Sequence, residues 1–147
     1  YRITYQAAKA CVATYYDMPF EKLMLSNEKL TPITDEPFIK EELESQVKML
    51  LAGMAACHIR FGEHSNSVKN DLDDAKNIVR KMCQEYGMGS SLLSEASEEK
   101  ITLERLYEES KHLLTSMPTV IANIEKVLLE RESVTKEDVK LLINEIF

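Results

Sequence analysis

Residues 52–88 read AGMAACHIRFGEHSNSVKNDLDDAKNIVRKMCQEYGM. The stretch begins with an apolar run that ends at Phe61-Gly62-Glu63, and glycine is the usual residue just after a helix end. A polar loop follows. An amphipathic pattern then runs from Asn70-Asp71-Leu72 to Tyr86-Gly87-Met88. Ser67 or Asn70 is the expected N-cap of this second helix. The stretch therefore predicts two helices joined by a loop, and the other segments can be arranged around this unit.

The segments before residue 52 predict a helix, a short extended piece and the first half of the long helix. Residues 1–17 are rich in alanine, the best helix former. Residues 20–25 (FEKLML) fit a strand or an extended link. Asp35 is the expected N-cap of the long helix, and its run Met49–Cys57 is almost wholly apolar, so this half should be buried. Gly53 costs a helix about 1 kcal/mol relative to alanine, which indicates close packing there.

The segments after residue 88 predict three more helices. The first covers residues 97–115, and Pro118 starts the second. Ser133-Val134 is expected to form a turn, with Thr135 capping the last helix. The predicted fold class is mainly α, a bundle of five to six helices with at most a short β element near residues 20–25. We expect a single domain, residues 1–147, made of regions 1–17, 36–88 and 97–147.

Composition narrows the function classes. The formal net charge of −7 and pI of about 5.1 argue against nucleic-acid binding, which needs a clustered basic face. No window approaches 18 uncharged apolar residues, so no membrane insertion by this segment is expected. Three widely spaced cysteines, Cys11, Cys57 and Cys83, fit buried reduced thiols in a cytoplasmic protein. The chain starts at Tyr1 rather than Met, and we expect it to be a piece of a longer protein.

Several of these blocks together resemble the peptidase domain of the FtsH family, the membrane-anchored, ATP-dependent zinc proteases. The blocks are Ala52-Gly53-Met54-Ala55-Ala56, Phe61-Gly62-Glu63, Asn70-Asp71-Leu72 with Ala75, and Tyr86-Gly87-Met88. Thr4-Tyr5 and Ala8 are similar to the start of the family's zinc-binding helix, and the three tail helices fit its C-terminal part. The resemblance implies an FtsH-peptidase-like bundle that covers nearly the whole chain.

The same resemblance implies that the metal site is missing. The family's helix carries His-Glu-x-x-His, which puts two imidazoles one turn apart beside one zinc ion, with the Glu as general base. In our alignment these positions read Gln6-Ala7-Ala8-Lys9-Ala10, so both ligands and the base are lost. Asp71 remains at the place of the family's third, carboxylate ligand. No catalytic residue, zinc or other cofactor is therefore expected, and Lys9 is a candidate partner for Asp71.

Other candidate sites have weaker patterns. His58, His64 and Asp71 lie within 14 residues, but this is not a usual metal-ligand spacing. Cys57 and His58 are adjacent, and neighbours on a helix point about 100° apart. The family's paired glutamates are Cys57 and His58 here. The segment 18–36, where the family has a cleft-edge strand for substrate, is short, so peptide binding is also in doubt.

Two function classes remain. The first is a non-catalytic homologue of the FtsH peptidase domain that acts as a structural, oligomerisation or interaction module. Its partners would be copies of itself or a mixed ring of related subunits, and ATP would matter only with an ATPase domain upstream of Tyr1. A membrane tether would likewise lie upstream. The second class is an active ATP-dependent metallopeptidase or other hydrolase with a relocated site. We favour the first class, because zinc chemistry needs groups that these positions do not supply.

Overall fold

The computed structural model describes residues 2–16, 22–24, 38–93, 95–131 and 133–146 of the protein. Six α-helices account for most of these residues, so the predicted mainly α class is confirmed. The elements in chain order are α1 (Arg2–Tyr15), β1 (Lys22–Met24), α2 (Lys40–Phe61), the 3-10 helix η1 (Asn66–Val68), α3 (Lys69–Gln84), α4 (Ala96–Thr115), α5 (Pro118–Arg131), β2 (Ser133–Thr135) and α6 (Lys136–Ile146). Among the described residues, no helix is both long enough and apolar enough to cross a membrane.

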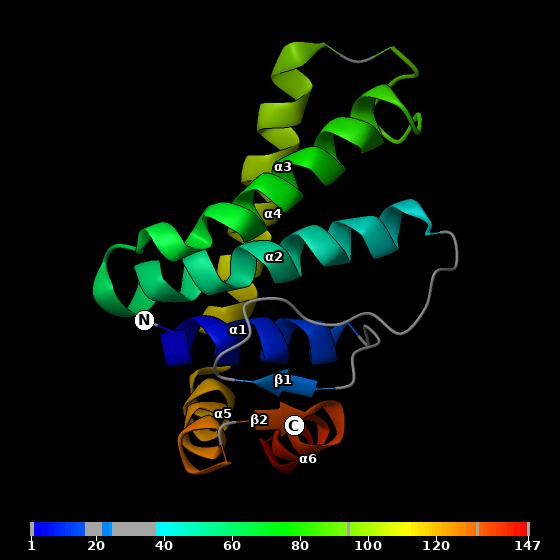
Figure 1. Cartoon of the computed structure of the whole chain (residues 1–147). Helices are drawn as coiled ribbons and strands as arrows, with labels where there is room; N and C mark the ends of the chain where they lie inside the picture. The colour runs from blue at the N-terminus through cyan, green and yellow to red at the C-terminus, as the bar shows by residue number, and fades with distance from the viewer. Residues whose placement is uncertain (1, 17–21, 25–37, 94, 132, 147) are drawn as a thin grey trace.

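The long helix α2 lies at the centre of the arrangement. Figure 1 shows α1 along one side of α2 and α3 along the other, with α4 running behind α2 from the α3 side toward α5. Helices α5 and α6 and the two strands lie beyond α1. Helix α1 therefore lies between α2 and the C-terminal helices, and both of its long sides are covered. This position explains its composition, because a helix packed on several sides needs small apolar residues all round.

The second half of α2 is the centre of the core, as predicted. Its buried residues pack in three clusters: one with α1 and α4, one with α3 and α4, and a small one in which Cys57 meets Tyr5 of α1 and Val68 of η1. Gly53 lies where α1 crosses, and a Cβ atom at this position would overlap the ring of Tyr5. The expected close packing at Gly53 is thus confirmed. Gly62 ends the helix with φ of 77°, the left-handed conformation that favours glycine.

The N-caps differ from those expected. Ser65 caps η1 by accepting a hydrogen bond from the Ser67 backbone N–H, and α3 continues from η1 without a side-chain cap of its own. Ser67 and Asn70 are therefore not the caps of α3, because the 3-10 turn already satisfies part of the helix start. Asp35 lies outside the described residues, and α2 begins at Lys40.

The C-terminal turn is also different. Ser133 and Val134 do not form a simple turn but belong to β2, which pairs antiparallel with β1. Leu23 lies opposite Val134, and Lys22 lies opposite Thr135. Thr135 is the last residue of this strand and stands directly before α6, so its role as the cap of that helix stays a prediction. The predicted β element near residues 20–25 is present, and its partner lies more than 100 residues away in the sequence, where local patterns give no signal.

Candidate functional site

The first turn of α3 meets α1 at a buried polar contact. Lys9 Nζ lies 2.8 Å from Asp71 Oδ2, and the side chains are 0% and 3% exposed. The hydroxyl of Tyr5 donates a hydrogen bond to the same carboxylate oxygen at 2.5 Å. Tyr5 and Lys9 are four residues apart, so they project from the same face of α1. Two side chains one helical turn apart thus converge on one carboxylate from the neighbouring helix.

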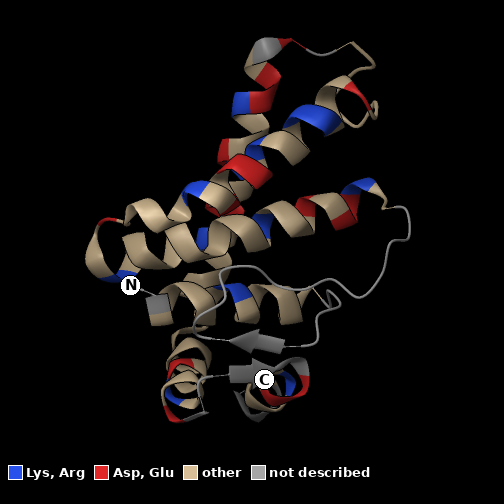
Figure 2. Cartoon of the chain, in the orientation of Figure 1, with Lys and Arg blue, Asp and Glu red and all other residues tan. Residues whose placement is uncertain are grey.

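This contact is buried, and the Tyr5 ring packs in an apolar cluster with Cys57 and Val68. Lys9 is the one charged residue of α1 after Arg2, and Figure 2 shows how little charge α1 carries compared with α2, α3 and α4. A buried charge needs a partner of opposite sign, because desolvation of an ion costs several kcal/mol. The Lys9 ammonium also lies 5.6 Å from the centre of the Tyr5 ring. Asp71 Oδ1 is buried and has no hydrogen-bond partner among the residues that the structure describes.

The predicted site residues do not all reach Asp71. Gln6 is buried in α1, next to Tyr5. Ala7 and Ala10 pack instead in an apolar cluster with α5 and α6, whose members include Met117, Val120, Ile124, Leu128 and Val139. Ala10, which the sequence alignment put at the second ligand position, therefore packs against α5 and α6 and not beside Asp71. Adjacent helical positions point about 100° apart, so a shift of one residue moves a side chain to another face of α1. The residues that contact the carboxylate are Tyr5 and Lys9, one position earlier.

One signal in the sequence could have located this contact. Lys9 is a single charge in an otherwise uncharged, alanine-rich stretch of helix. Such a residue is almost never fully buried unless it is paired. The pairing of Lys9 with Asp71 was identified as a candidate and is confirmed. The hydrogen bond from Tyr5 has no comparable signal in the sequence, because a tyrosine on a helix can also pack in an apolar core without contacting a carboxylate.

The two histidines at the end of α2 meet each other. His58 Nε2 lies 2.5 Å from His64 Nδ1, and the Tyr107 hydroxyl lies 2.7 Å from His58 Nδ1. Burial lowers the pKa of His58, and the nearby His64 and Lys111 lower it further. The third member of the candidate set, Asp71, is held by Lys9 and Tyr5. Among the residues that the structure describes, no group of three or more His, Cys, Asp or Glu side chains is arranged to hold a metal ion.

The cysteines are structural. All three are free and buried, as expected. Burial raises the pKa of Cys11 to about 12 and also raises the pKa of Cys57 and Cys83. A thiol with a raised pKa is a poor nucleophile, because the thiolate is the reactive form. This supports the interpretation of Cys57 as a core residue and not as a partner of His58.

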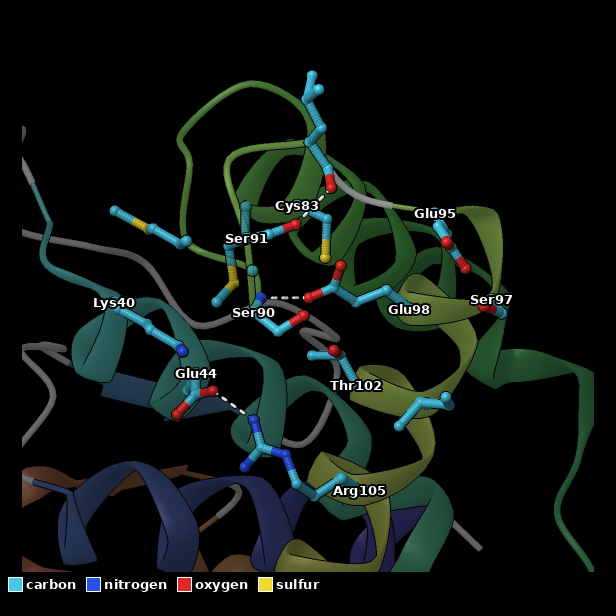
Figure 3. A pocket seen from close by; sticks show the side chains of 15 residues that line it. Lys40, Glu44, Cys83, Ser90, Ser91, Glu95, Ser97, Glu98, Thr102 and Arg105 are labelled. Atoms are coloured by element: carbon cyan, nitrogen blue, oxygen red, sulfur yellow. Dashed lines mark hydrogen bonds and ion pairs between the residues drawn. The ribbon is translucent and has the colours of Figure 1, made fainter.

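A separate pocket of about 500 Å³ lies where the start of α2 meets the end of α3 and the start of α4. Figure 3 shows its polar side chains, with Arg105 bound to Glu44 and the Ser90 backbone N–H donating to Glu98. Arg105, Glu44 and Glu98 therefore already have polar partners within the pocket lining. Tyr5, Lys9 and Asp71 do not line this pocket.

Comparison with known proteins connects the fold to a family. The family model for Peptidase family M41 matches residues 24–102, just over half of the chain. A similar protein is the "ATP-dependent zinc metalloprotease FtsH 2" of Symbiobacterium thermophilum, 30% identical over 136 residues that cover 78% of this chain and 23% of the relative. The protein of the same name in Thermoanaerobacter sp. is 35% identical over 119 residues, 72% of this chain and 23% of the relative. The "ATP-dependent zinc metalloprotease FtsH" of Methylococcus capsulatus is 31% identical over 142 residues, 76% of this chain and 22% of the relative.

The matches cover only part of the relatives, and the family model covers only part of this chain. The chain spans less than a quarter of the length of each of these three relatives. The family match begins at residue 24, after α1. The matched range includes α2, α3 and Asp71 but not Tyr5 or Lys9. The alignment of α1 with the family's metal-binding helix therefore depends on the contacts of Tyr5 and Lys9 with Asp71.

Proposed function

The chain belongs to peptidase family M41, and from this membership we propose that it is a non-catalytic homologue of the FtsH peptidase domain. The relatives are named as ATP-dependent zinc metalloproteases. A zinc peptidase of this kind needs three protein ligands, an activated water and a general base. This chain contains no His-Glu-x-x-His sequence at any position. We therefore propose that it acts as a structural or interaction module.

The observation that carries this proposal is the ion pair of Lys9 with Asp71. A zinc ion at this carboxylate would have to replace an ammonium group that lies 2.8 Å from Asp71 Oδ2. An ammonium group has no lone pair to offer a metal, and a neutral tyrosine hydroxyl is not among the usual zinc ligands. The residues around Asp71 therefore do not fit zinc.

The described helices support a module that assembles with other subunits. Large apolar side chains are exposed at several places, among them Ile101, Leu129 and Leu141. We propose association with copies of this chain or with related subunits, beside an ATPase domain in the same or another chain. The alternative, a hydrolase with a relocated site, would depend on His58 and His64, because these are the two imidazoles that lie together among the described residues.

The purified chain tests both candidates. We expect no stoichiometric zinc by elemental analysis and no degradation of casein, with or without added zinc. Light scattering on the same sample checks the proposed association. The matched control is His58→Ala with His64→Ala, which should not change the zinc content. One zinc per chain that disappears in this control, or zinc-dependent casein cleavage, would overturn the proposal and favour the relocated site.

A further inference from the structure

We propose that Lys9 is a built-in cation that takes the place of the metal ion between α1 and α3, with Tyr5 and Lys9 at the two imidazole positions. This inference deepens the proposed function and depends on it. It changes the alignment by one residue from the sequence-based expectation, in which Gln6 and Ala10 held these positions. It also gives Tyr5 and Lys9 a common role, which is to hold the start of α3 without a metal.

The geometry of α1 favours this alignment. In a His-Glu-x-x-His helix the two ligands are four residues apart and point at one ion, which a third ligand from another element completes. Here the two residues of α1 that share this spacing and meet the Asp71 carboxylate are Tyr5 and Lys9. Gln6 then lies at the position of the general base. A glutamine amide cannot take a proton from water at neutral pH, so the base is lost together with the ligands.

The other side of α1 disfavours the alternative alignment. Ala10 is fully buried in the cluster with Met117, Val120 and Val139, and Ala7 belongs to the same cluster. A ligand side chain at position 10 would therefore enter an apolar core shared with α5 and α6. A glutamate at position 7 would bury a charge in the same core, at a cost of several kcal/mol.

Electrostatics explains why a lysine is suited to this place. The Asp71 carboxylate is 3% exposed and needs a positive partner, which a metal or an ammonium group can provide. The Lys9 ammonium contributes one positive charge through a covalently attached side chain, so no ion has to be captured. Tyr5 adds a hydrogen bond to the same oxygen, and Gly53 leaves room for its ring. The contact between α1 and α3 is therefore independent of metal.

Two triple variants test this inference, and each restores His-Glu-x-x-His under one of the two alignments of α1. The first is Tyr5→His with Gln6→Glu and Lys9→His, and the control is Gln6→His with Ala7→Glu and Ala10→His. We expect the first to bind one zinc per chain in calorimetric titration, and to lose this binding when Asp71→Ala is added. We expect the control to bind no zinc and to melt at a lower temperature than the wild type.

A second measurement keeps the inference testable if the first triple variant does not fold. Lys9→Met leaves the Asp71 charge buried without its cation, and adding Asp71→Asn removes that charge. We expect the double variant to melt at a higher temperature than Lys9→Met alone, and chelator to leave the wild-type melt unchanged. Zinc binding by the control triple variant and not by the first, or no recovery in the double variant, would overturn the inference. Neither result depends on whether the wild type cleaves casein, so failure of the proposed function is seen separately.

Discussion

Two ion pairs at the start of α3 have the same chemistry and the same length but opposite surroundings. Lys9 and Asp71 lie 2.8 Å apart with side chains 0% and 3% exposed. Lys69 and Asp73 also lie 2.8 Å apart, with side chains 77% and 54% exposed. The two aspartates are two positions apart on one helix, so they point about 200° apart. One carboxylate faces α1 and the other faces solvent.

The difference shows that distance alone does not indicate what an ion pair contributes. In solvent, each charge of the exposed pair is well hydrated when the other is removed, so little changes. In the core, removing one partner leaves an uncompensated charge without water. The buried pair is therefore expected to control whether α1 and α3 pack together, and the exposed pair is expected to be almost neutral for stability.

The largest expected effect comes from breaking the buried pair. Lys9→Met keeps an unbranched side chain but removes the charge, and it should lower the free energy of unfolding by about 3–5 kcal/mol. Urea denaturation followed by circular dichroism measures this loss. The matched control is Lys69→Met, the same change at the exposed pair of α3. Equal unfolding midpoints for the two variants would show that burial does not distinguish the pairs.

A smaller loss of stability is expected when Gly53 is replaced, because its missing side chain leaves room for the Tyr5 ring beside Asp71. Gly53→Ala adds a methyl group that overlaps the ring. Overpacking of this kind costs about 1–3 kcal/mol, and the better helix propensity of alanine returns about 1 kcal/mol. We therefore expect a net loss of up to about 2 kcal/mol in thermal or urea unfolding.

The background variant Tyr5→Ala tests the cause of this loss. With the ring absent, Gly53→Ala should be neutral or stabilising, because only the gain in helix propensity remains. A penalty of the same size in both backgrounds would mean that the loss does not arise from contact with Tyr5.

The sequence predicted the parts of the fold that depend on neighbouring residues. The apolar run Met49–Cys57, the helix end at Gly62 and the helix start at Pro118 are local signals, and the structure has each of them. The pairing of β1 with β2 depends on two three-residue strands far apart in the chain. A strand was expected near residues 20–25, but residues 133–135 are too few to show an alternating pattern, so the partner strand was not recognised. The caps of α3 were missed because the 3-10 helix η1 precedes it.

The location of the candidate site was predicted, but the residues of α1 that contact Asp71 were only partly predicted. Asp71 and its candidate pairing with Lys9 followed from the resemblance, which put both residues beside the place of the family's metal site, and the structure has this pair. The positions of α1 that face α3 did not follow, because alanine fits either side of a buried helix and gives no amphipathic pattern. A shift of one residue then rotates the expected site by about 100°. The contacts of Tyr5 and Ala10 with their neighbours decide between the two alignments.

The smallest expected effect is at the exposed pair. The hydrogen bond and positive charge of Lys69 hold the pKa of Asp73 below its usual value. A carboxyl whose pKa is lower in the folded state adds stability above its unfolded pKa, about 4, and loses this contribution as the pH falls through the folded value. Water and salt screen this pair, so Lys69→Met should leave the unfolding midpoint at pH 7 within error of the wild type. Carbon-13 NMR titration should show the pKa of Asp73 rising toward its usual value in this variant. Added salt should produce the same rise in the wild type but leave the wild-type unfolding midpoint unchanged. A clear fall in that midpoint with salt that is absent from Lys69→Met would mean that the exposed pair contributes to stability and would remove the contrast with Lys9 and Asp71.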